Sequence, residues 1–136
     1  MIANITTRDK GGVIVVDVSG RLTLSEGSSA LREKIWELVE TGFKRILINM
    51  ADITSIDNSG LGELVAAYTT VSSAGGEMKL LSVGKRVKQL LQITKLCAVF
   101  ETHDDETSAI RSFSPTQIVA RFESPSEVIL GLKALT

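Results

Sequence analysis

One short polar stretch holds the residues best suited to chemistry in this chain of 136 residues. Asp57, Asn58 and Ser59 stand between an apolar segment, residues 45–50, and a helical pattern that begins near Leu61. A side-chain oxygen at the start of a helix accepts hydrogen bonds from backbone N–H groups that have no partner within the helix. The stretch therefore predicts a capped helix start, with any of these three side chains as the cap.

Gly60 and Gly62 leave the backbone of the same stretch bare and open to close approach. One interpretation is structural, because glycines at a capped helix start permit close packing. The other is functional, because the ligands and partners of an α/β sheet usually meet the loops at the carboxyl ends of its strands. Residues 51–62 are predicted to form such a loop, and their spacing alone leaves both interpretations open.

The sequence lacks the combinations of side chains that catalysis or metal binding would need. The segment Gly60-Leu61-Gly62 is neither a Walker loop with its lysine nor a full G-x-G-x-x-G. Ser59 has no glycine two residues before it, which a nucleophile elbow requires. His103, the only histidine, lies beside acidic residues, where a solvated surface role is expected. Asp52 and Asp57 have no histidine or cysteine nearby, so we predict no metal site, no cofactor and no catalytic residue.

Composition and charge argue against several classes of partner. Apolar residues make up 43% and charged residues 23% of the chain, which is typical of a folded domain. The formal net charge of −1, with acidic and basic residues interleaved, predicts neither nucleic acid nor a membrane as the main partner. No apolar run could span a bilayer and the first residues do not form a signal peptide, so a cytoplasmic protein is expected. The single cysteine, Cys97, has apolar neighbours and is predicted to be a buried, inert thiol.

Apolar periodicity predicts alternating strands and helices, and hence an α/β domain. An N-terminal hairpin is expected where residues 2–8 pair with the β-branched strand 13–20. The nearly all-apolar strand 45–50 should be central and covered on both faces. Further strands are expected at 78–83 and 97–100, and helices at 31–42, from about 61 to 73, at 86–94 and at 103–113. This order implies a mixed, mostly parallel sheet of about five strands flanked by about four helices.

The segment after a composition shift at residues 112–115 is interpreted as an extension, which divides the chain into 1–112 and 113–136. Residues 116–123 resemble a strand, and a short helix begins after Ser124 with a capping box. This helix carries an apolar stripe of Val128, Ile129, Leu132 and Leu135. A helix of about eleven residues is marginal alone in water, so the stripe is expected to dock on its own domain or to pair with a second copy in a homodimer.

Three stretches of the chain resemble the STAS domain of bacterial anti-sigma factor antagonists. They are VDVSGRL at 16–22, RILINMADITSIDNSGLGELV at 45–65 and GGEMKLLSVGKRVKQLLQITKL at 75–96. The resemblance runs across residues 3–112, and its specific core is the pattern D-x-S-G-L-G. It implies a STAS-like α/β fold, in which a small mixed sheet is flanked by helices.

The resemblance also implies a function without catalysis. Members of this family bind an anti-sigma factor that is itself a serine kinase, and so release a sigma factor and regulate transcription by partner switching. The kinase phosphorylates a serine at the start of the second helix, which ends binding, and a phosphatase reverses the modification. The alternatives are a STAS component of a larger scaffold or of a transport complex, without phosphorylation, and an enzyme, against which the missing acid–base pair counts.

Residue by residue, the match places the family's switch at the polar stretch. Asp57 matches the family's aspartate, and Gly60-Leu61-Gly62 match its G-L-G. The phosphorylated serine of the family stands directly after the aspartate, where this chain has Asn58, and Ser59 matches a second hydroxyl position. Ser59 is therefore the phosphorylation candidate, unless Asn58 marks a protein that has left the phosphorylation cycle and binds constitutively.

The partner-binding surface is expected to combine the start of the second helix with the segment GRLTLSEG, residues 20–27. In that segment Thr23 stands where many relatives carry an acidic residue. Because the sequence shows no packing need for the glycines, a bulky residue at Gly60 is expected to weaken binding and to leave stability nearly unchanged. The residues expected to contact the anti-sigma factor are Arg21, Thr23, Asp57, Asn58, Ser59, Gly60, Leu61 and Gly62.

Overall fold

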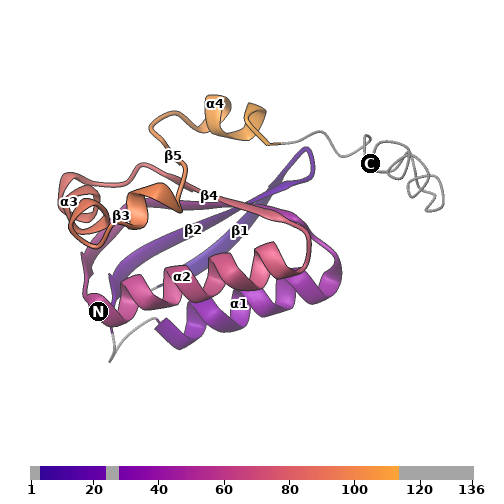
Figure 1. Cartoon of the computed structure of the whole chain (residues 1–136). Helices are drawn as coiled ribbons and strands as arrows, with labels where there is room; N and C mark the ends of the chain where they lie inside the picture. The colour runs from indigo at the N-terminus through magenta and orange to yellow at the C-terminus, as the bar shows by residue number, and fades with distance from the viewer. Residues whose placement is uncertain (1–3, 24–27, 114–136) are drawn as a thin grey trace.

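The computed structural model describes residues 4–23 and 28–113, which form a five-stranded sheet with helices packed on it (Figure 1). The elements, in chain order, are β1 (Asn4–Lys10), β2 (Val13–Leu22), α1 (Ser28–Thr41), β3 (Arg45–Ile56), α2 (Asn58–Ser73), β4 (Glu77–Leu81), α3 (Lys85–Ile93), the 3₁₀ helix η1 (Leu96–Ala98), β5 (Thr102–His103) and α4 (Glu106–Arg111). The order of strands and α-helices matches the one predicted from the sequence.

The strands lie in the sheet in chain order, β1-β2-β3-β4-β5. β1 pairs antiparallel with β2 through a turn at Gly11 and Gly12, whose positive φ angles of 65° and 95° favour glycine. The remaining pairs are parallel, which confirms the expected mixed, mostly parallel sheet. α1 and α2 both pack on the larger core and so cover the same face of the sheet (Figure 1).

The central strands are buried on both faces, so their alternate residues enter two separate cores. In β3, the side chains of Ile46 and Ile48 enter the larger core beneath α1 and α2. Leu47, between them, enters a smaller core on the opposite face. The smaller core consists of Val13, Val15, Leu47, Leu81, Ala109 and Phe113. The prediction that strand 45–50 is covered on both faces is therefore confirmed.

β3 continues through residues that the sequence predicts to be a loop. Residues 51–56 are strand because they pair with the end of β2, where Leu22 lies opposite Ile56. Two register shifts in this part of the ladder each place an extra residue on β3, as in a β-bulge, which bends a strand and redirects its side chains. The predicted loop at 51–62 is therefore wrong, since only Asp57 separates β3 from α2.

The prediction of a strand at residues 97–100 is also wrong. The segment lies in and directly after η1, and β5 follows further along the chain. Within this apolar run only Phe100 is buried, whereas Cys97 is exposed and not, as predicted, buried. A short apolar run does not distinguish a strand from a helical turn, because periodicity needs more residues to show itself.

Ion pairs hold α4 against the first two strands. The Arg8 guanidinium donates to both carboxylate oxygens of Asp17, at 2.7 and 3.0 Å, and to those of Glu106, at 2.8 and 3.2 Å. Asn49 adds a hydrogen bond to Asp17 at 2.7 Å. The hydrogen bonds from Arg8 are the main reason why the pKa values of Asp17 and Glu106 lie below their usual range. Asp105 caps α4, because its Oδ2 accepts a hydrogen bond from the backbone N–H of Ser108 at 2.9 Å.

Lys79 is buried beneath the end of α4, with 8% of its surface exposed. Its ammonium group donates to the backbone and hydroxyl oxygens of Ser112, at 2.8 and 2.9 Å, and lies 3.1 Å from a carboxylate oxygen of Glu101. The ring centroid of Phe113 lies 4.8 Å from the same nitrogen, a cation–π arrangement. The described chain thus ends packed beside β4, and the strand and capped helix expected within 114–136 lie outside the described residues.

Candidate partner-binding surface

Asp57 caps α2 and so fixes the start of the helix. Its backbone is extended, with φ −117° and ψ −174°, and its Oδ1 accepts from the backbone N–H of Gly60 at 2.8 Å. Its carbonyl accepts a helical hydrogen bond from the N–H of Leu61 at 2.9 Å. The predicted capped start is confirmed, with Asp57 as the cap, and Asn58 and Ser59 occupy the first two positions of the helix.

Gly60, in the first turn of α2, packs directly against the end of β2. A Cβ atom at Gly60 would overlap the carbonyl oxygen of Leu22 and would lie 2.9 Å from Cγ1 of Ile56. Only glycine permits this approach, so the expectation that a bulky residue at Gly60 leaves stability nearly unchanged is wrong. Gly62, by contrast, is exposed, and a Cβ atom there would meet no described atom within 4 Å.

The close approach at Gly60 brings the start of α2 against Leu22 at the carboxyl end of β2. Of the predicted segment 20–27, residues 24–27 lie outside the described residues. Arg21 is exposed, and Thr23, directly after β2, is half-buried. Asn58 is exposed and Ser59 is half-buried at the start of α2. The side chain of Leu61 is buried in the larger core, so it supports the surface from below.

An ion pair that sequence reasoning missed joins the two helices beside this surface. Arg32 of α1 donates through Nε to Oε1 of Glu63 of α2 at 3.0 Å, and its Nη2 pairs with the other carboxylate oxygen. The hydrogen bond to Glu63 raises the pKa of Arg32 above its usual value. No local pattern in the sequence could have shown this pair, because only the packing of α1 against α2 brings the two residues together.

Residues able to bind metal or transfer protons are not gathered at this surface in the described part of the chain. Among residues 4–23 and 28–113, no group of three His, Cys, Asp or Glu side chains is placed to hold a metal ion. Nε2 of His103 lies 2.6 Å from Oε2 of Glu101, within the charged cluster around Lys79 and not beside Asp57.

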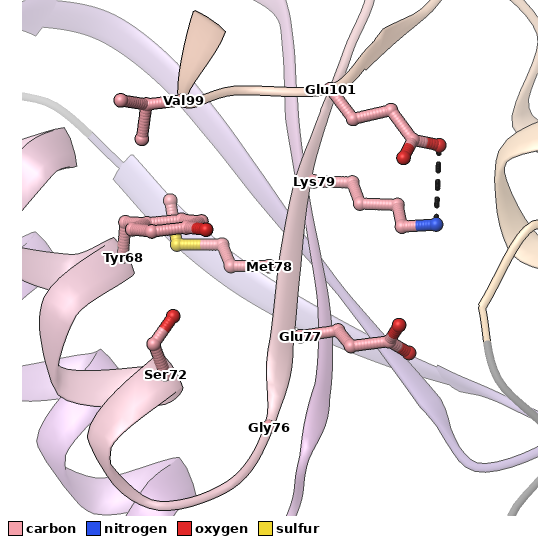
Figure 2. A pocket seen from close by; sticks show the side chains of 8 residues that line it. All are labelled: Tyr68, Ser72, Gly76, Glu77, Met78, Lys79, Val99 and Glu101. Carbon is pink, nitrogen blue, oxygen red and sulfur yellow. Dashed lines mark ion pairs between the residues drawn. The ribbon is translucent and has the colours of Figure 1, made fainter.

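A cavity of about 190 Å³ lies along β4 (Figure 2). In the described part of the chain, no helix combines the length and the apolarity needed to cross a bilayer.

Comparisons with known proteins agree with this architecture. The family model described as the STAS domain matches residues 4–109. The anti-sigma-B factor antagonist of Bacillus subtilis (strain 168) is 30% identical over 96 residues, which are 71% of this chain and 86% of that protein. A Thermotoga neapolitana relative, named as the homologue of a candidate anti-sigma factor antagonist, is 35% identical over 74 residues, which are 54% of this chain and 66% of that protein.

The fold also matches solved structures. The Bacillus cell fate determinant SpoIIAA, in its phosphorylated form, superposes with a TM-score of 0.64 at 19% identity. The match covers 79% of this chain and 97% of SpoIIAA. At this identity the likeness concerns the fold, and it confirms the STAS-like α/β architecture expected from the sequence.

Proposed function

This chain belongs to the STAS domain family, and from that premise we propose that it is an anti-sigma factor antagonist. It binds an anti-sigma factor of the serine-kinase type and so releases a sigma factor, which regulates transcription by partner switching. A relative of which the chain covers 86% carries the role of antagonist in its name. We place the protein in the cytoplasm, where sigma factors act, and assign it no catalytic activity, no cofactor and no metal.

The observation that carries the proposal is the junction of β2 and α2 at Gly60. At this junction the carbonyl of Leu22, at the end of β2, lies against the first turn of α2, where Asn58 and Gly62 are exposed. This surface lies at the carboxyl ends of parallel strands, where α/β proteins usually meet their partners. Its exposed polar side chain at Asn58 and bare backbone at Gly62 suit contact with another protein.

Gly62→Arg tests the proposed surface without the packing conflict at Gly60. Full-length wild type captures its anti-sigma factor from the native host, and calorimetry with the purified partner then measures affinity. Gly62→Arg should weaken binding on the order of tenfold or more, as a bulky group at the centre of an interface does. Gly84→Arg is the matched control, because Gly84 is also exposed and a Cβ atom there would meet no described atom within 4 Å.

Two outcomes would contradict this proposal. If Gly62→Arg and Gly84→Arg bind the anti-sigma factor as tightly as wild type, the partner uses another surface. If capture from the host yields a membrane transport complex and no anti-sigma factor, the protein serves the alternative role of a STAS component in such a complex.

We propose further that the surface binds constitutively. The family's acceptor position carries Asn58, which has no hydroxyl, and Ser59 is half-buried at the second position of α2. A phosphate on Ser59 would add about −1.5 to −2 charges near the positive end of the helix dipole, which tolerates anions. Phosphorylation there would therefore act through bulk and repulsion at the interface, without unfolding the domain.

Phosphorylation assays separate a constitutive binder from a switched one. Wild type, Ser59→Ala and Asn58→Ser are incubated with the cognate kinase and ATP, and mass spectrometry locates the phosphate. We expect phosphate only on Asn58→Ser, where a phosphatase of the same system should remove it. Phosphate on wild type that disappears in Ser59→Ala would overturn the proposal and make Ser59 the switch.

A further inference from the structure

The outer edge of β4 is only half covered. β5 pairs with β4 at Leu80 and Leu81 alone, and no other strand among the described residues runs beside Glu77–Lys79 on that side. The N–H of Leu80 points toward β5 and donates to the carbonyl of Glu101 at 3.0 Å. Residues two apart in a strand direct their backbone groups to the same side. The N–H and C=O of Met78 therefore point outward from this open edge, as those of Leu80 point toward β5.

A groove of about 190 Å³ follows the open edge (Figure 2). Tyr68 and Ser72 of α2 point toward β4 from one side, and Val99 lies toward the end nearer β5, as Figure 2 shows. Met78 turns to the side of α2, whereas Lys79 turns to the opposite face of the sheet. The groove thus offers apolar contacts beside strand backbone that no other described strand pairs with, the combination by which an extended segment adds to a sheet.

The C-terminal segment of this chain starts within reach of the groove. The ammonium group of Lys79 binds the oxygens of Ser112 and lies over the ring of Phe113. Lys79 itself belongs to the part of β4 that β5 does not cover. Extended chain covers about 3.3 Å per residue, so the few residues from Phe113 to Thr116 can bridge the length of one lysine side chain. The remaining 23 residues, 114–136, are long enough to continue along the whole edge.

We infer that residues 116–122 add to the sheet as an extra strand along the open edge of β4. The segment TQIVARF is rich in β-branched residues, Thr116, Ile118 and Val119, as is typical of strands. Strand periodicity places Ile118, Ala120 and Phe122 on one face, and this apolar face meets Tyr68 and Val99. The backbone of the segment pairs with Met78 and covers an edge that would otherwise be open to association with other chains.

The chain's own segment is a stronger candidate for this edge than a second copy. A segment joined to its site by a short linker experiences an effective concentration in the millimolar range. A second copy would have to compete at the much lower concentration of the free protein. Phe113 fixes the start of the linker in the smaller core, so little further order is needed before the segment pairs.

Amide hydrogen exchange in the full-length protein tests the inference. Adjacent residues of a strand direct their N–H groups to opposite sides, so either Val119→Pro or Ala120→Pro must remove a hydrogen bond to β4. Nuclear magnetic resonance should show the Met78 amide exchanging at least tenfold faster in one of these variants than in wild type. Ala134→Pro, in the same segment but beyond the proposed strand, is the matched control and should leave Met78 protected.

Two results of the exchange measurement would contradict the proposed strand. Equal exchange at Met78 in wild type, Val119→Pro and Ala120→Pro overturns the inference, because no strand then pairs there. Protection that grows with protein concentration also overturns it, since the strand would come from a second copy. Neither result bears on the anti-sigma factor, whose surface lies at the start of α2, so the proposed function stands or falls separately.

The single, exposed Cys97 provides an independent measurement. It lies in η1, two residues before Val99 of the groove. A nitroxide attached to Cys97 should broaden the amide signals of residues 116–122 within the same molecule, and should do so less in the variant that loses protection at Met78. Mixing spin-labelled protein with isotope-labelled protein that carries no nitroxide should leave these signals sharp. Broadening in the mixture would again assign the strand to a second copy and overturn the inference.

Discussion

Two glycines in the same short motif have different roles. Gly60 lies against the carbonyl of Leu22, where any side chain would overlap the backbone of β2, whereas Gly62 faces solvent. The sequence predicted a capped helix start that contains both glycines. It could not show that only Gly60 is needed for packing. The contact that makes Gly60 necessary is with a residue far earlier in the chain, and no local pattern records it.

Alanine substitutions at the two glycines should change stability in opposite directions. Gly60→Ala should lower the free energy of unfolding by about 1–3 kcal/mol, because the added methyl group displaces packed backbone. Gly62→Ala should raise it by about 0.5–1 kcal/mol, because alanine is the better helix former at an exposed position. Urea denaturation of both variants measures the difference, and similar values would show that Gly60 makes no special contact.

The cap at Asp57 gives a second prediction for a single residue. Asp57→Ala should lower the free energy of unfolding by about 1 kcal/mol, because it removes the acceptor for the N–H of Gly60. Asp57→Ser should retain most of the stability, since a serine hydroxyl also caps helices well. Thermal or urea unfolding compares the two variants. An equal loss in both would mean that Asp57 stabilises the fold by some other contact.

At the scale of secondary structure, α4 is a short helix whose attachment depends on charge. Arg8 of β1 reaches Glu106 in the first turn of α4, and it shares its guanidinium with Asp17 of β2. Both carboxyl groups have pKa values below their usual range, chiefly because they accept hydrogen bonds from Arg8. A carboxyl group whose pKa falls on folding stabilises the folded state while it is ionised.

This linkage predicts how acid acts on the attachment of α4. The contribution of Arg8 to stability should be fully present above the unfolded pKa values, which lie near 4. It should be lost as the pH falls through the lower folded pKa values of Asp17 and Glu106. Urea denaturation should therefore show Arg8→Gln less stable than wild type at pH 7, with a smaller difference at pH 3. Arg86→Gln, at an exposed position on α3, is the control and should show no such convergence.

How well each element could be predicted depends on where its stabilising contacts lie in the chain. The strand 45–50 and the helix that follows were predictable, because their apolar periods reflect the layers that cover them. The second half of β3 was not, since polar residues such as Asp52 and Ser55 form strand there by pairing with β2. The same reason explains the ion pair of Arg32 and Glu63, which was missed because it joins two helices.

At the scale of the whole molecule, the two proposed binding sites use different parts of one sheet. The anti-sigma factor is proposed to meet the carboxyl ends of β2 and β3, around Arg21 and Asn58. The C-terminal segment is proposed to pair with the outer edge of β4, at Met78. The first site is made of exposed side chains on a fixed junction, and the second consists largely of backbone. One domain can therefore engage a partner at the first site while the second covers its own sheet edge.

The oligomeric state follows from this arrangement. If residues 116–122 cover the edge of β4, the full chain should be a monomer of 14.6 kDa by light scattering at every concentration tested. A chain that ends at Phe113 keeps the described cores but leaves the edge open, and exposed edges associate with other strands. Its mass should therefore rise with concentration. A full chain at twice the monomer mass, reduced to a monomer by this truncation, would instead show that the C-terminal segment joins two copies.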